Sequence, residues 1–362
     1  MKSTYKNRFR VLGISILLII GIFSLQACKN EEKDMTVPGG SRLKVSLVNS
    51  SVESETITLK NGNKSSSSQN ALPTAQVSSQ KIDESNTIDI SLTPITSKSI
   101  QKNTINGDIS NKAALVQKVL EPGTKYDIII YGNDGKFVAK KTYSYGEEAS
   151  DLGIQLDAGK TYTVIATSIN SKTTTQAIID QQLLSTATLA NVNSQLMYFK
   201  KVIKMNEGDN QMDVILKHQF SEITTKLHMD ENKTGNITEI KNPFFQLSHS
   251  SANLNIGSGA VSYNGLPTVG QAATYPNIGA GVRSITSAPT LLIHPSTTTE
   301  ILKFERLEVD GEVKNNVLVD KLKLTPGHRY DLDILFKTCT QDVTGAEGLN
   351  WDYAEVSEFG TS

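Results

Sequence analysis

The sequence predicts an all-β protein, with two tandem Greek-key β-sandwiches following an export signal. Three observations lead to this prediction: segments in which apolar and polar residues alternate, turn residues between those segments, and a Leu-x-x-Gly-x-x-Tyr pattern that occurs three times. Alternation with a period of two is typical of strands that bury one face. Turns rich in Gly, Asn and Asp between such strands favour antiparallel sheets over helices.

Residues 1–27 are predicted to be a lipoprotein signal peptide. MKSTYKNRFR carries four cations and no acid, and residues 11–25 form an apolar run shorter than the roughly 20 residues that span a membrane. The run ends in Leu25-Gln26-Ala27-Cys28, which resembles the lipobox of bacterial lipoproteins. In that family the signal is cut before the cysteine and its sulfur is acylated. The resemblance implies acyl chains such as palmitate on Cys28 and anchoring in the outer membrane; the alternative is a free thiol beside a short membrane segment.

Residues 28–41 are the predicted tether. The segment KNEEKD (29–34) is similar to the acidic tag that follows the acylated cysteine in surface-exposed lipoproteins of the Bacteroidota. A solvated charged spacer explains the same residues equally well.

Charge and cysteine content limit the partners of the processed chain. Without residues 1–27 it has 32 basic and 37 acidic residues, a net charge of −5 that argues against a nucleic-acid partner. Cys339 is then the only other cysteine, so we expect no disulfide within the chain. The length suits two domains of ordinary size.

The predicted N-terminal sandwich covers 42–175 and the C-terminal sandwich, with a tail, covers 190–362. Apolar residues share one face in several segments: RLKVSLVN (Leu43, Val45, Leu47), TIDISL (Ile88, Ile90, Leu92), KLHMD, LEVDGEV and DLDILF. Asn133-Asp134-Gly135 and Asp310-Gly311 predict hairpin turns. The stretch between Asn170 and Ser194 lacks strict alternation and is expected to connect the two domains.

The repeated pattern predicts a structural corner. Each copy is a strand end, a turn that needs a permissive glycine, and a new strand opened by a tyrosine whose ring packs inward while its hydroxyl bonds a nearby backbone group. The copies are Leu120/Gly123/Tyr126, Leu156/Gly159/Tyr162 and Leu324/Gly327/Tyr330.

The order of these features resembles the fimbrillins, which are stalk and accessory subunits of Bacteroidota fimbriae (type V pili). The resemblance rests on the lipoprotein signal and on four stretches: YDIIIYGNDGKF, LDAGKTYTVIATSIN, MDVILKHQFSEITTKL and CTQDVTGAEGLNW. It implies two transthyretin-like sandwiches, export as a lipoprotein to the cell surface, and assembly with other fimbrial subunits into a fibre that supports adhesion to a host or bacterial receptor.

In that family a protease cuts after a basic residue, the first strand is lost, and a strand of the next subunit fills the groove. Arg42 is the candidate for processing, since it is the only arginine in the N-terminal half after the signal. However, no good strand precedes it, and a solvated cation at the start of a strand is the ordinary alternative. The tail NWDYAEVSEFGTS is a candidate donor strand, with Trp351, Tyr353 and Val356 as plugs.

The sequence predicts neither an enzyme nor a bound cofactor or metal. The five histidines have no metal-ligand spacing, and motifs such as HEXXH, CXXC, GXSXG and the P-loop are absent. Pairs such as Glu147-Glu148 read as solvated acids beside turns. A hydrolase of the sandwich class would need clustered acids that the sequence does not indicate.

The main alternative function is a non-polymerising surface lipoprotein that binds glycan or host protein. Such a protein needs an exposed aromatic platform, and the uncharged stretch 242–282, with Phe244, Phe245, Tyr263 and Tyr275, is where we expect it. The same stretch also reads as buried strands joined by glycine turns.

Overall fold

The computed structural model describes residues 40–51, 73–84, 86–95, 117–118, 120–232, 235–266, 270–296 and 299–338. Within these ranges the chain is built from β-strands, and the one helical element is the short 3-10 helix η2 (Glu148–Ser150). The predicted all-β class is therefore confirmed. No helix in the described part of the chain is long and apolar enough to cross a membrane.

An eight-stranded sheet surrounds the first core. Its order is β4-β1-β12-β11-β8-β5-β6, with β7 pairing with β1. The strands are β1 (Gly40–Ser51), β4 (Gln117–Lys118), β5 (Lys125–Gly132), β6 (Phe137–Ser144), β7 (Ile154–Asp157), β8 (Thr161–Ser168), β11 (Met197–Lys204) and β12 (Gly208–His218). Alternate side chains of these strands, among them Leu43, Ile128, Val164 and Val214, fill the core.

A second core lies between two further sheets. One has the order β18-β13-β22-β3-β2, with β19 pairing with β13, and the other has the order β17-β14-β20-β21. The first comprises β2 (Gln76–Lys81), β3 (Asn86–Pro94), β13 (Ser221–Met229), β18 (Ser284–Thr286), β19 (Thr290–Leu292) and β22 (Arg329–Thr338). The second comprises β14 (Ile237–Gln246), β17 (Gln271–Ala272), β20 (Thr299–Val309) and β21 (Glu312–Lys323).

A third cluster covers the outer face of the eight-stranded sheet. It packs β5 and β8 against a sheet of order β16-β15-β10-β9, made of β9 (Ile178–Ile179), β10 (Thr188–Val192), β15 (Ser251–Asn255) and β16 (Val261–Asn264). Consequently Ile128 and Ile130 face the first core while Ile129 and Tyr131 face the third cluster. Burial on both sides explains why this segment reads as a continuous apolar run rather than an alternating one.

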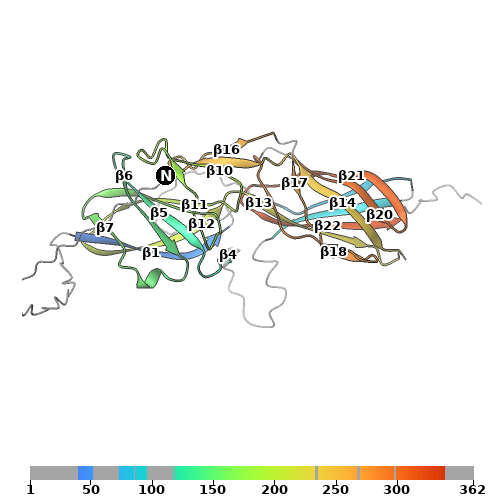
Figure 1. Ribbon diagram of the computed structural model, residues 1–362, viewed down its shortest axis with the longest axis horizontal. Helices are drawn as coiled ribbons and strands as arrows, with labels where there is room; N and C mark the ends of the chain where they lie inside the picture. Colours follow the sequence, from blue (N-terminus) through green and yellow to red (C-terminus); the bar gives the residue numbers. More distant parts are fainter. Residues whose placement is uncertain are drawn as a thin grey trace, which may run out of the picture. The chain divides into compact units, whose positions relative to one another are not determined.

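Each half of the chain contributes strands to the core of the other half. The cores therefore do not correspond to the segments 42–175 and 190–362. β11 and β12 pair within the first sheet, whereas β2 and β3 join β22 in the second sandwich. Figure 1 shows these two early strands in light blue among the orange and red strands of the second half. The expected connector contains β9 and β10. Alternation specifies which face of a strand is buried, but the partner that covers that face is set by packing across the whole chain.

The tyrosine corners are confirmed in structure. Gly123, Gly159 and Gly327 adopt φ of +85°, +78° and +83°, and the three leucines and three tyrosines are buried. The hydroxyl of Tyr162 accepts the backbone N–H of Asp157 at 3.1 Å, and that of Tyr330 accepts the N–H of Thr325 at 2.8 Å. The first corner differs, because Tyr126 donates instead to a carboxylate, that of Glu148, at 2.9 Å.

Both predicted hairpin turns are also present. Asp310 and Gly311 have φ of +58° and +75° and join β20 to β21. Two successive positive φ values match the twist of the flanking strands. Gly135, at φ +75°, similarly closes the hairpin of β5 and β6.

Candidate functional site

β1 is the first strand of the described chain, and it is held mainly by strand pairing and three apolar side chains. Leu43, Val45 and Leu47 are at most 6% exposed and point into the first core. On the opposite face, Lys44 forms an ion pair with Asp209 at 2.7 Å. The alternating sequence of β1 therefore provides one apolar face and one solvated face.

The two edges of β1 have different neighbours. β12 pairs with it in parallel from residue 41 to 51, with one irregularity between Leu47 and Asn49. On the other edge, the described strands pair only at the ends: β7 with residues 40–43 and β4 with residues 50–51. The middle of this outer edge, residues 44–49, has no strand beside it in the described part of the chain.

A hollow lies beside β1 at this outer edge. It has a volume of about 380 Å³ and is lined by Lys44, Val45 and Ser46 of β1 and by residues of the segment that joins β6 to β7, including Glu148 and Asp151. Where that segment reaches β7, a Cβ atom on Gly153 would lie only 2.7 Å from the carbonyl oxygen of Leu43. The two backbones therefore meet closely at Gly153, and the hollow lies between β1 and the residues that precede Gly153.

Arg42, the predicted processing residue, lies inside β1. It is the third residue of the strand and is half-buried opposite Asp209 of β12 and Gln155 of β7. A cut after Arg42 would leave residues 43–51 and all three buried apolar side chains attached to the rest of the chain. The position matches the alternative of a cation at the start of a strand.

The other sequence-predicted site residues lie outside the described residues. These are the lipobox Leu25, Gln26 and Ala27, the lipidation residue Cys28, and the donor-strand plugs Trp351, Tyr353 and Val356. Each of them remains a prediction.

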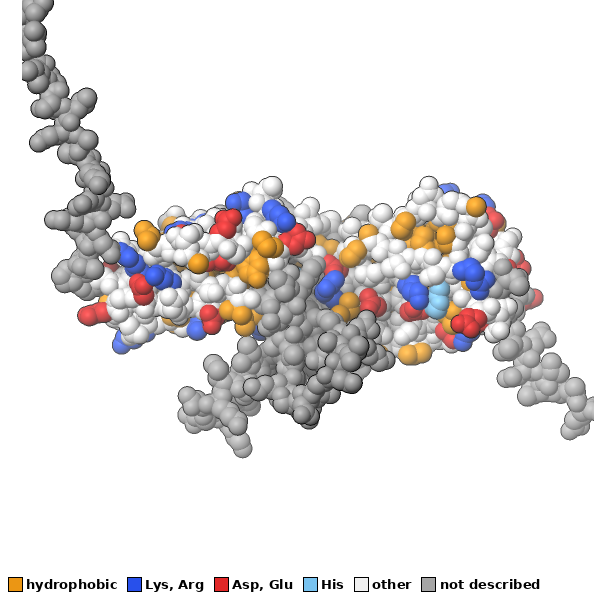
Figure 2. All heavy atoms as spheres, turned by 90° about the horizontal axis from the view of Figure 1, so that it is seen from below, with side chains coloured by type: hydrophobic (Ala, Val, Ile, Leu, Met, Phe, Trp, Pro, Cys, Tyr) orange, Lys and Arg blue, Asp and Glu red, His pale blue; other side chains and the backbone are white. Residues whose placement is uncertain are grey.

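Three of the four aromatic residues expected to form a binding platform are packed on a core, and the fourth, Phe244, is half-buried. Phe245 is fully buried, and Tyr275 packs against the second core. Tyr263 packs against the third cluster, and its ring lies at a tilt of 33° to that of His249, with centroids 5.2 Å apart. The stretch 242–282 contributes to β14, β15, β16 and β17; β14 and β15 bury Phe245, Ala252 and Leu254, whereas both residues of β17 are exposed. On the face drawn in Figure 2, charged side chains of both signs are interspersed.

Buried titratable groups occur away from β1. His294 is 1% exposed and within 3.1 Å of the Ser221 hydroxyl, and burial lowers its pKa to about 4. Glu300 is fully buried, and burial raises its pKa to about 8. In the parts of the chain that are described, no group of three or more His, Cys, Asp or Glu side chains could hold a metal ion.

Sequence reasoning missed two of these features. Glu300 lies on the same face of β20 as the buried Leu302 and Phe304, so the alternating sequence indicates that its carboxyl faces the core. Glu148 was expected to be a solvated acid, yet it accepts a hydrogen bond from the buried Tyr126. No local pattern distinguishes that contact, because its partner lies 22 residues earlier.

Comparisons with known proteins identify similar solved structures only. No family model matches the chain, and no curated protein matches it either. The chain is similar to a candidate cell adhesion protein of Bacteroides fragilis NCTC 9343, at 12% identity and a TM-score of 0.41, covering 68% of this chain and 94% of that one. It is similar to a candidate cell adhesion protein of Bacteroides uniformis ATCC 8492, at 12% identity and a TM-score of 0.42, covering 60% and 91%. A fimbrial assembly protein of Parabacteroides distasonis ATCC 8503 matches at 15% identity and a TM-score of 0.34, covering 58% and 82%.

Proposed function

We propose that the chain is a structural subunit, stalk or accessory, of cell-surface fimbriae. It is exported as a lipoprotein through Cys28, joins neighbouring subunits by strand exchange, and supports adhesion. The resemblance to the fimbrillins supports assignment to that family. The structural observation that supports strand exchange is the way in which β1 is bound. Among its described side chains, three enter the first core; the Lys44–Asp209 ion pair and the Ser41 hydroxyl, which donates to the Leu156 carbonyl, add polar contacts, and the rest of its binding is main-chain pairing.

Loss of β1 would leave an elongated apolar groove. One wall would be the exposed edge of β12, and the other would be β7 with the hollow beside it. An extended segment of another subunit can restore the same main-chain pairing and insert apolar side chains at the positions of Leu43, Val45 and Leu47. Replacement in this manner joins two subunits without any reactive side chain.

The cut that frees β1 has to fall after Ser51 and before Gln76, where β2 begins. The basic residues in that interval are Lys60 and Lys64. We therefore propose cleavage after one of these lysines for release of β1, whereas a cut after Arg42 would separate the lipid anchor and leave the groove filled.

N-terminal sequencing and lipid analysis of the protein from cell surfaces test this proposal. We expect a membrane-bound form that begins at acylated Cys28 and a fibre form that begins after Lys60 or Lys64. A protein that retains residues 1–27 inside the cell would overturn export as a lipoprotein. Fibres whose subunits all still contain residues 40–51 would overturn strand exchange at β1.

A further inference from the structure

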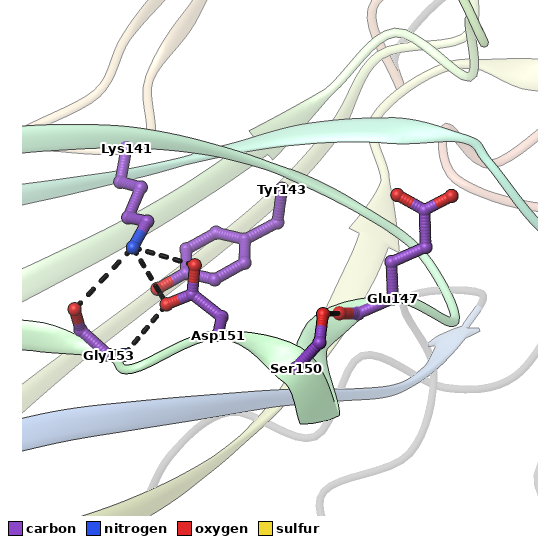
Figure 3. Close-up of polar contacts among 6 residues, drawn as sticks. All are labelled: Lys141, Tyr143, Glu147, Ser150, Asp151 and Gly153. Carbon is purple, nitrogen blue, oxygen red and sulfur yellow. Dashed lines mark hydrogen bonds and ion pairs between the residues drawn. The ribbon is translucent and has the colours of Figure 1, made fainter. Parts of the chain in front are cut away.

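The segment between β6 and β7 stands at the outer edge of β1. We call residues 145–153, which include η2, the β6–β7 loop. η2 contacts β1, and none of its three residues is buried. Figure 3 shows β1, in blue, passing beside this short helix.

One carboxylate fastens the start of the β6–β7 loop. Glu148 accepts the hydroxyl proton of Tyr126 at 2.9 Å through one oxygen and the N–H of Gly146 at 2.8 Å through the other. Burial of the phenol and the adjacent carboxylate raise the pKa of Tyr126, so this hydroxyl stays protonated and can donate. Tyr126 is fully buried and belongs to β5, the strand that pairs with β6.

A second carboxylate fastens the end of the loop. Asp151 pairs with Lys141 of β6 at 2.7 Å and accepts the N–H of Gly153 at 2.7 Å. The Tyr143 hydroxyl lies 3.3 Å from the same carboxylate. Figure 3 shows the Lys141 amine between Asp151 and the Gly153 carbonyl.

Tyr145, the first residue of the loop, packs against the first core and bonds the backbone of Thr124. Apolar packing contributes little to holding the rest of the loop, residues 146–153. Leu152, its largest aliphatic side chain, is 72% exposed. Glu148 and Asp151 line the hollow of about 380 Å³ together with Lys44, Val45 and Ser46 of β1. Residues 146–153 can therefore move away from β1 by breaking a few polar contacts, while Tyr145 stays packed against the first core.

We propose that the β6–β7 loop is a latch that controls when β1 can leave its groove. This inference rests on the proposed function, in which β1 is the exchanged strand. β12 blocks one edge of β1 along most of its length and is itself paired with β11. β1 would therefore leave through its outer edge, which the latch borders. Glu148 and Asp151 fasten the latch, and Tyr126 positions Glu148.

Hydrogen–deuterium exchange on the full, uncut chain tests the latch directly. Glu148→Gln and Asp151→Asn remove one carboxylate charge each, and Tyr126→Phe keeps the buried ring while removing the donor. Asp134→Asn is the matched control, because it removes an exposed ion pair, with Lys136, at the other end of the same hairpin. We expect amides of residues 44–48 to exchange about tenfold faster or more in the three latch variants, as loss of a charge-assisted hydrogen bond implies. Exchange in the middle of β5 should match the wild type, which also shows that the variants fold.

Unchanged exchange at residues 44–48 in all three latch variants, or the same acceleration in Asp134→Asn, would overturn the latch. A second measurement separates the latch from the proposed function. After cleavage between β1 and β2, uptake of a synthetic peptide of residues 40–51 should be faster in the latch variants. Faster amide exchange with no peptide uptake in any variant would support the latch and contradict strand exchange at β1.

Discussion

Replacing Glu300 with glutamine is expected to stabilise the protein, and the gain should depend on pH. The Glu300 side chain is 0% exposed, and neither carboxylate oxygen has a hydrogen-bond partner among the described residues. Burial raises the pKa from its ordinary 4.5 to about 8. The folded protein therefore holds a proton that the unfolded chain releases above pH 4.5, so stability falls as pH rises from about 4.5 to about 8.

The magnitude follows from the size of the shift. Each pKa unit corresponds to about 1.4 kcal/mol, so the loss of folding stability caused by Glu300 grows to as much as about 3 kcal/mol at pH 7 and about 5 kcal/mol above pH 8. Glu300→Gln cannot ionise and should recover this free energy. Below pH 4.5 the two proteins should differ little.

Urea denaturation of wild type and variant from pH 4 to pH 9 measures this difference. Subtracting the two profiles cancels the other titrations, including that of His294, whose lowered pKa makes stability rise with pH between about 4 and 6.5. Glu305→Gln, an exposed residue of the same strand, is the control and should change stability by less than about 0.5 kcal/mol. A variant of Glu300 that is no more stable than wild type at pH 8, or whose advantage is the same at every pH, would refute a neutral, unpaired carboxyl in the core.

Phenylalanine at Tyr162 or at Tyr330 should each lower the free energy of unfolding by about 1 kcal/mol, because the partly buried N–H that bonds the hydroxyl loses its partner; unchanged urea midpoints would contradict a structural role for the two hydroxyls. Gly153→Ala should cost roughly 3 kcal/mol, since the new Cβ meets the Leu43 carbonyl and the backbone has φ +89°. Gly146→Ala, at the same φ of +89° but with open space around it, should cost only about 1 kcal/mol. Equal thermal shifts in the two alanine variants would mean that the loop does not approach β1 as closely as described.

Much of the local structure follows from the sequence. The alternation in RLKVSLVN assigns Leu43, Val45 and Leu47 to the core, and the structure buries all three. The tyrosine corners are equally local, because the residues that form each one lie within seven positions of each other. In these cases the backbone geometry and one nearby partner determine the outcome.

The sheet order could not be predicted in the same way. β3 pairs with β22, more than 230 residues later, and β1 pairs in parallel with β12. Both strands show the same alternating pattern, so nothing local indicates that one belongs to the first core and the other to the second. The candidate site depends on this pairing, since the groove is defined by what lies on either side of β1. The position of Arg42 near the start of a strand could be predicted from the sequence, but the strands on either side of it, β12 and β7, could not.

The exchange of β1 in a cut protein tests the central claim most directly. A chain in which residues 65–68 are replaced by a recognition site for a specific protease can be cut between β1 and β2 and incubated with an isotopically labelled peptide of residues 40–51. Native mass spectrometry should then show the labelled peptide in place of the original strand, while the uncut chain takes up none. A cut protein that keeps its own β1 indefinitely, or that unfolds instead of binding the peptide, would contradict the proposal that this groove joins one subunit to the next.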